Sequence, residues 1–136
     1  MTRYVIDAAT LVHLVDHGLQ VHASHQLVAP NRIRSEALDL LLQQVLAGVR
    51  EERDALAAHE RMTGLTMRLL GDRVSRGTAW QLAREHGWSL RDAEHIAVVR
   101  LQADALVTVD PELAARAGPL VTVAPVEALL TPAEGR

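Results

Sequence analysis

Several residue types are missing from the sequence, and each absence excludes a class of chemistry. There is no cysteine, so disulfide bonds and thiolate metal sites are excluded, which suits a reducing compartment. There is no lysine, and all 14 basic residues are arginine, so a catalytic lysine and a P-loop nucleotide site are excluded. No apolar run approaches the ~18 residues that a membrane span requires, and no signal peptide is expected. We therefore expect a soluble, cytoplasmic protein with no membrane partner.

Aromatic residues and net positive charge are also scarce. Aromatic side chains make up 2% of the chain and phenylalanine is absent, so the core has to be built from aliphatic residues. The net charge of -3 provides no global basic field, and a nucleic-acid partner would have to be held by local groups. The length of 136 residues suits one domain with a full core, which we place at residues 1–130, followed by a short tail at 131–136.

Short runs of strand-forming residues alternate with helical patterns along the chain. Strands are predicted at residues 4–7, 26–29, 67–70, 105–109 and 120–123, with 67–70 at an edge of the sheet. Helices are predicted at residues 10–16, 33–48, 50–62, 75–86, 90–102 and 111–118, with Asn31 and Ser89 as caps. Such alternation favours an α/β fold, a three-layer sandwich with a central, mostly parallel sheet of about four to five strands.

Four acidic residues are placed by this pattern at one edge of the sheet. Asp7 and Asp110 each follow a predicted strand, and the carboxyl ends of parallel strands share an edge. Glu36 and Asp92 fall in the first turns of helices that have to begin at the same edge. Glu94 lies slightly further along its helix and is a supporting candidate.

Three of the four acids also have a local explanation. Asp92 fits a capping box with Ser89, and Asp110 is a suitable N-cap before a helix that starts with proline. For Glu36, the local explanation is that the dipole of its helix or a neighbouring arginine stabilises its negative charge. Asp7 stands between an apolar strand and two alanines and has no evident local partner. It is therefore the strongest candidate for a functional role.

Taken together, the four acids need a counter-charge. Two carboxylates ~4 Å apart repel by roughly 4 kcal/mol at an effective dielectric constant of about 20. A divalent cation supplies the opposite charge, and oxygen ligands without cysteine point to Mg²⁺ or Mn²⁺, which can activate a bound water against a phosphodiester. The predicted metal ligands and catalytic residues are Asp7, Glu36, Asp92 and Asp110.

Two further groups of residues suggest contacts with partners. Arg32, Arg34 and Arg91 flank the acids and could hold phosphates, or could simply balance the charge of the carboxylates. The leucines and valine between residues 38 and 46 form a broader apolar face than one core contact requires. Part of that face is expected to be an interface, with a second copy of the chain or with a partner helix.

Histidine and tryptophan provide weaker signals. His13 and His17 have a spacing that can chelate zinc, but no metalloprotease motif accompanies them, which favours solvated histidines. Trp80 and Trp88 are too few for an aromatic platform that stacks on bases, and Trp88 is better explained as a packing residue.

Four segments resemble, in order and spacing, the successive motifs of the PIN-domain family. They are Tyr4–Ala8, Val28–Pro30 leading to Glu36, Ser89–Ala93 and Ala105–Ala114. No single segment is diagnostic, but the resemblance covers nearly the whole chain. Its length and the spread of the motifs resemble the VapC-type ribonuclease toxins of type II toxin–antitoxin systems.

The resemblance implies a metal-dependent endoribonuclease that hydrolyses RNA phosphodiester bonds with Mg²⁺ or Mn²⁺ held by the four acids. It implies that Thr108, two residues before Asp110, orients a ligand. Ala9 departs from the Ser or Asn that is frequent in the family, and Thr10 could take over that contact. The resemblance also implies a homodimer and a cognate VapB-like antitoxin.

Two alternatives belong to other functional classes. One is a catalytically degenerate PIN domain that binds RNA or a protein without cutting, which the departure at Ala9 motivates. The other is a different acid-edged α/β fold, such as a phosphoryl-transfer receiver or a haloacid-dehalogenase-like phosphatase. Both of these usually need a lysine, and the phosphatase needs Asp-x-Asp where this chain has Asp7-Ala8-Ala9, so the sequence argues against them.

Overall fold

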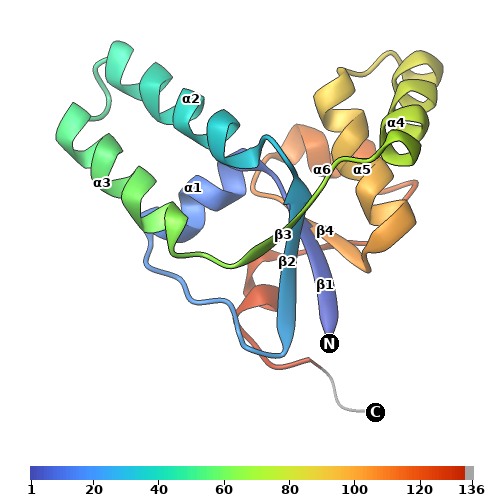
Figure 1. Ribbon diagram of the computed structural model, residues 1–136, viewed down its shortest axis with the longest axis horizontal. Coiled ribbons are helices and arrows are strands. Elements are labelled where there is room, and N and C mark those ends of the chain that lie inside the picture. The colour runs from blue at the N-terminus through green and yellow to red at the C-terminus, as the bar shows by residue number, and fades with distance from the viewer. Residues whose placement is uncertain (134–136) are drawn as a thin grey trace.

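The computed structural model describes residues 1–133, which form one sheet covered by helices on both faces (Figure 1). All neighbouring strands run parallel, in the order β3-β2-β1-β4-β5. The strands are β1 Thr2–Ile6, β2 His25–Pro30, β3 Met67–Leu70, β4 Ala105–Val107 and β5 Val123–Ala124. The predicted three-layer α/β architecture is confirmed, as is the position of β3 at an edge of the sheet.

Six α-helices connect the strands, and one 3₁₀ turn follows the last strand. They are α1 Ala8–Asp16, α2 Ile33–Leu46, α3 Glu52–Thr63, α4 Arg73–His86, α5 Leu90–Gln102, α6 Pro111–Ala117 and the turn Val126–Leu129, which the sequence did not predict. Helices α1, α2 and α3 lie on one side of the sheet, and α4, α5 and α6 lie on the other (Figure 1). Helices α2 and α3 pack side by side as a hairpin.

Alternation along β1 distributes its side chains between two aliphatic cores. Ile6 is buried with α1, α2 and α3, whereas its neighbour Val5 is buried with α4, α5 and α6. Successive side chains of a strand point to opposite faces, so a strand covered on both faces has to be apolar at successive positions. Val5 aligns with Val28 of β2 and with Leu106 of β4, and this register places the ends of the three central strands together.

The helix caps confirm two predictions and correct a third. Ser89 caps α5 and Asp110 caps α6, as expected. Asn31 is not a cap, because α2 begins after Arg32 without a side-chain bond to its amides. The Asn31 amide instead donates to the Leu70 carbonyl of the neighbouring strand (3.0 Å), which positions that residue before the helix begins.

Two strands are shorter than predicted. Strand β4 ends at Val107 instead of residue 109, and the next two residues bond to side chains at the start of α1: the Thr108 hydroxyl to Asp7, and the Val109 amide to Thr10. The last strand covers Val123–Ala124 alone, since only these residues align with β4. The shortening of β4 leaves irregular backbone at the carboxyl edge, directly before Asp110, whereas the last strand loses residues 120–122 at its amino end.

The described part of the C-terminal tail is attached to the domain. His25 Nε2 donates to the Thr131 carbonyl (2.5 Å), and the Ala133 amide donates to Ser24 Oγ (2.8 Å). The rest of the predicted tail, residues 134–136, lies outside the described residues. Among the helices of residues 1–133, none has the length and apolar character needed to cross a membrane.

Candidate functional site

Asp7 is a buried carboxylate whose partners are all neutral. It follows β1 and caps α1, and it is 8% exposed. Its Oδ1 accepts from the Thr10 amide (3.2 Å) and from the Thr10 hydroxyl, and its Oδ2 accepts from the Thr108 hydroxyl (3.0 Å). Within residues 1–133, Asp7 forms no ion pair. Its negative charge is stabilised by hydrogen bonds and the α1 dipole alone, which leaves it available to a cation.

The two threonine hydroxyls join Asp7 to the start of α6. Thr10 Oγ1 accepts from the Val109 amide (3.0 Å), and Thr108 Oγ1 accepts from the Asp110 amide (3.0 Å). Each hydroxyl therefore contacts the Asp7 carboxylate and also holds the backbone that precedes Asp110. Thr10 and Thr108 thus both contact Asp7, and their supporting roles at a metal stay predictions.

Asp92 is paired with an arginine that the sequence analysis did not identify. Its Oδ2 lies 2.5 Å from Nη1 of Arg116 on α6, and Nη2 of the same guanidinium lies 2.7 Å from Glu112 Oε1. The Asp92 amide donates to Ser89 Oγ (3.2 Å), which is one half of the predicted capping box. The other half is absent from the described residues, because the Asp92 carboxylate turns toward Arg116 instead of the Ser89 amide.

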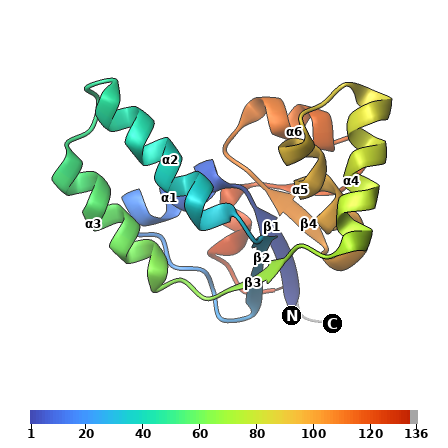
Figure 2. The ribbon, with the colours of Figure 1, turned by 45° about the horizontal axis from the view of Figure 1, so that its top comes forward.

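Glu36 lines a cavity of about 480 Å³ between the starts of α2 and α5. Helix α2 lies on one side of β1, with α5 and α6 on the other (Figure 2). Burial raises the pKa of Glu36, and the nearby Glu94 raises it further, while His95, Arg91 and Arg32 oppose the shift. The carboxylate is thus held where its charged form is disfavoured. The cavity is lined by Arg32, Ser35, Glu36, Asp39, Leu40 and Arg91.

The raised pKa of Glu36 predicts a pH-dependent effect of Glu36→Gln on metal-free protein. Below the ordinary value of 4.5, folded and unfolded chains are both protonated there, and the substitution should change stability little. As the pH rises through the raised pKa, the folded wild type bears a desolvated charge, so the variant should be the more stable protein at about pH 7.

Thermal unfolding in EDTA, at a pH below 4 and at about pH 7, measures this difference. Glu60→Gln, which alters an exposed acid of α3, is the matched control. An equal stability difference between the Glu36 variant and the wild type at both pH values would contradict the assignment of Glu36 as a strained carboxylate.

His95 is a second residue at the site that the sequence analysis missed. It is 2% exposed, and its Nδ1–H donates to the Arg91 carbonyl (2.7 Å), so Nε2 is the unprotonated nitrogen in the neutral ring. This buried Nε2 has no hydrogen-bond partner among the described residues. The signal was its position three residues after Asp92, which puts both residues on one face of α5.

The three candidate arginines are not equivalent. Arg34 Nη2 donates to the Leu65 carbonyl (2.9 Å), so this guanidinium is used in packing α2 against the segment before β3. Its predicted role beside the acids loses support, because the bond directs it to backbone. Arg32 and Arg91 line the cavity of Glu36, and their contact with phosphate stays a prediction.

The histidine and tryptophan expectations agree with the structure. His17 Nδ1 donates to the His13 carbonyl (3.0 Å), and the two rings lie 4.3 Å apart at their centroids, which is a local contact within α1. Trp88 stacks on His86 (4.2 Å between centroids) and packs on the core of α4 and α5. Trp80 is exposed.

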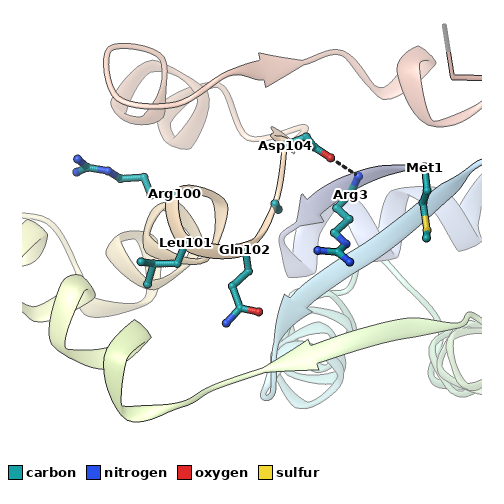
Figure 3. A pocket seen from close by; sticks show the side chains of 7 residues that line it. Met1, Arg3, Arg100, Leu101, Gln102 and Asp104 are labelled. Carbon is teal, nitrogen blue, oxygen red and sulfur yellow. Dashed lines mark hydrogen bonds between the residues drawn. The ribbon is translucent and has the colours of Figure 1, made fainter. Parts of the chain in front are cut away.

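A different cavity, of about 370 Å³, lies at the opposite edge of the sheet (Figure 3). There the amide of Arg3, near the start of β1, donates to Asp104 Oδ2 (2.7 Å). Arg100 and Gln102 at the end of α5 contribute to the same cavity. None of the four candidate acids lines it, and it is therefore not part of the candidate site.

The four acids share one edge of the sheet but do not form a closed metal site. Within residues 1–133, no group of three or more His, Asp or Glu side chains is arranged to hold an ion. Asp7 and Asp110 are joined through Thr108, Asp92 is paired with an arginine, and Glu36 lies in its own cavity. The chemistry still fits Mg²⁺ or Mn²⁺, because the donors are hard oxygens and the buried Asp7 charge has no cationic partner there.

No family model matches the chain, and no curated protein matches it in sequence. Solved structures with a similar fold include the following three. PAE2754 from Pyrobaculum aerophilum is 23% identical, with a TM-score of 0.74, covering 95% of this chain and 94% of that one. VapC20 from Mycobacterium tuberculosis, described as a toxin that cleaves the sarcin–ricin loop, is 19% identical, with a TM-score of 0.59, covering 82% and 93%. VapBC-1 from nontypeable Haemophilus influenzae is 14% identical, with a TM-score of 0.60, covering 90% and 97%. These similarities confirm the predicted three-layer α/β fold, which this chain shares with the three structures.

Proposed function

We propose that this protein is an endoribonuclease that uses Mg²⁺ or Mn²⁺ to hydrolyse RNA phosphodiester bonds, and that it is the toxin of a toxin–antitoxin pair. The observation that carries the proposal is the buried Asp7 carboxylate, held by two hydroxyls at the carboxyl edge of a VapC-type fold. Ligands of such sheets bind at this edge. The similarity in fold to VapC20, described as a toxin that cleaves the sarcin–ricin loop, supports a nuclease activity here.

Asp7, Asp110, Asp92 and Glu36 would hold the cation. When bound, it would neutralise charge on the phosphodiester and lower the pKa of an attacking water. Thr108 fixes the orientation of the Asp7 carboxylate through Oδ2 and, through the Asp110 amide, the start of α6. Because Asp7 and Asp110 share the Thr108 hydroxyl, this arrangement restricts the movement of both proposed ligands.

The arginines of the Glu36 cavity would bind the substrate. Arg32 directly precedes α2 and Arg91 lies in the first turn of α5, and both line the cavity of Glu36, so an RNA backbone between these helices would meet guanidinium groups from both sides. Guanidinium groups bind phosphate oxygens in a bidentate manner. Local contacts of this kind are needed because the net charge of the chain is -3.

Incubation of a structured RNA pool with the purified protein, free of any partner, tests the activity. We expect cleavage with Mg²⁺ or Mn²⁺ and none in EDTA. Folded protein that binds Mn²⁺ but cuts no RNA under any of these conditions would contradict the nuclease proposal and support the second candidate, an RNA-binding PIN domain without activity. The Asp92–Arg116 ion pair is the observation that favours this second candidate, since it occupies one of the proposed ligands.

The partner proposals have separate support. The fold is similar to VapBC-1, and on this basis we propose that a VapB-like antitoxin binds the chain.

Leu38, Leu42 and Leu46 are exposed on α2 at intervals of four residues, whereas Leu41 of the same helix is fully buried. A stripe of exposed leucines on a helix is a typical interaction surface. We propose that it mediates homodimerisation.

Leu42→Asp is therefore expected to convert a dimer into a monomer. A carboxylate buried in an apolar interface has no counter-charge, so association should be strongly weakened. Light scattering coupled to size exclusion measures the mass of each species at equal concentration. Leu101→Asp introduces the same charge at an exposed leucine of α5 and should leave the mass unchanged. A wild-type protein that is already monomeric would contradict this proposal.

A further inference from the structure

Arg116 makes the only ion pair that the described structure provides to any of the four candidate acids. It lies in the last turn of α6 and reaches back to Asp92 in the first turn of α5. Its side chain is 31% exposed and that of Asp92 is 21% exposed. The second contact, with Glu112, involves a partner that is 71% exposed and is therefore weaker.

The two contacts of Arg116 differ in consequence. Glu112 lies four residues before Arg116 on the same helix, so this pair orients the guanidinium within α6 and involves none of the four candidate acids. Asp92 is on another helix and is a proposed metal ligand, so its pairing with Arg116 supplies the positive charge that a cation would otherwise bring. A guanidinium and a divalent cation compete when both require the same carboxylate oxygens.

We infer that Arg116 is a positioning residue that holds Asp92 as an internal counter-ion and competes with the divalent cation for its carboxylate. The inference rests on the proposed metal-dependent function. It adds that the ion pair opposes binding of the cation. Cation binding through Oδ2 of Asp92, the oxygen that Arg116 contacts, requires that the ion pair be broken, and Glu112 then retains the released guanidinium beside the site. Arg116 thus stabilises the metal-free protein and lowers its affinity for the cation.

Titration of Mn²⁺ into the metal-free protein without RNA, followed by electron paramagnetic resonance, tests this inference. Arg116→Gln should bind Mn²⁺ between about threefold and tenfold more tightly than the wild type, since the competing pair is removed. Arg116→Lys keeps the positive charge and should retain an affinity near that of the wild type. Arg100→Gln has the same net charge change at the opposite edge of the sheet, and its affinity should stay within about twofold of the wild type.

A second readout separates competition from a purely structural role. The melting temperature of Arg116→Gln should fall below that of the wild type in EDTA, and saturating Mn²⁺ should raise it by more than it raises the wild type. Arg116→Gln that binds Mn²⁺ as the wild type does, or more weakly, would overturn this inference while leaving the proposed function intact. Absence of Mn²⁺ binding in every protein would overturn both proposals.

Discussion

Asp7→Asn should lower the rate of RNA cleavage by at least about a hundredfold, because it removes the charge from the most buried of the candidate ligands. The fold should survive, since asparagine caps a helix as well as aspartate does and retains one oxygen to accept from Thr10. Initial rates with Mn²⁺ on one defined RNA, together with circular dichroism spectra, measure both effects.

Asp54→Asn is a suitable control for the loss of one carboxylate. Asp54 is an exposed residue of α3 whose partner is Arg50, far from the carboxyl edge of the sheet in sequence and in the fold. Its cleavage rate should equal that of the wild type. A folded Asp7→Asn protein that retains the wild-type rate would show that cleavage does not depend on this carboxylate, and the proposed site would be wrong.

Leu41→Ala should destabilise the protein by about 2–5 kcal/mol, the usual cost of a cavity in an aliphatic core. Leu41 is 0% exposed and packs in the core formed by α1, α2 and α3. Its neighbour Leu42 is 51% exposed, and Leu42→Ala should change the stability of the monomer by less than about 1 kcal/mol. Urea unfolding with equal slopes for the proteins measures the difference.

Leu41→Ala should also affect the candidate site. Leu41 anchors α2, and Glu36 lies in the first turn of that helix, so loss of the anchor should also weaken Mn²⁺ binding in protein that is still folded. Equal destabilisation by Leu41→Ala and Leu42→Ala would contradict the assignment of Leu41 to the core and of Leu42 to the surface.

Much of the fold could be predicted because its signals are local. A buried parallel strand needs successive apolar residues on both faces, and Tyr4–Ile6 and Ala105–Val107 have them. Ser89 and Asp110 cap their helices through bonds that reach only two or three residues along the chain, so short-range patterns identified both. The edge strand 67–70 and the positions of the acids at strand ends or in first helical turns followed from the same reasoning.

The sequence by itself therefore determined the order of the elements, their parallel pairing and the edge at which the acids gather. The tertiary structure alone decided which side chains contact Asp7 and Asp92. The Asp7–Thr108 bond spans 101 residues and the Asp92–Arg116 pair spans 24, and neither separation corresponds to a helical or strand period. Electrostatic partners depend on distances in space, and residues far apart in sequence acquire those distances only when the helices pack. For this reason the positions of the four acids in the fold could be predicted from sequence, whereas the arginine that pairs with Asp92 could not.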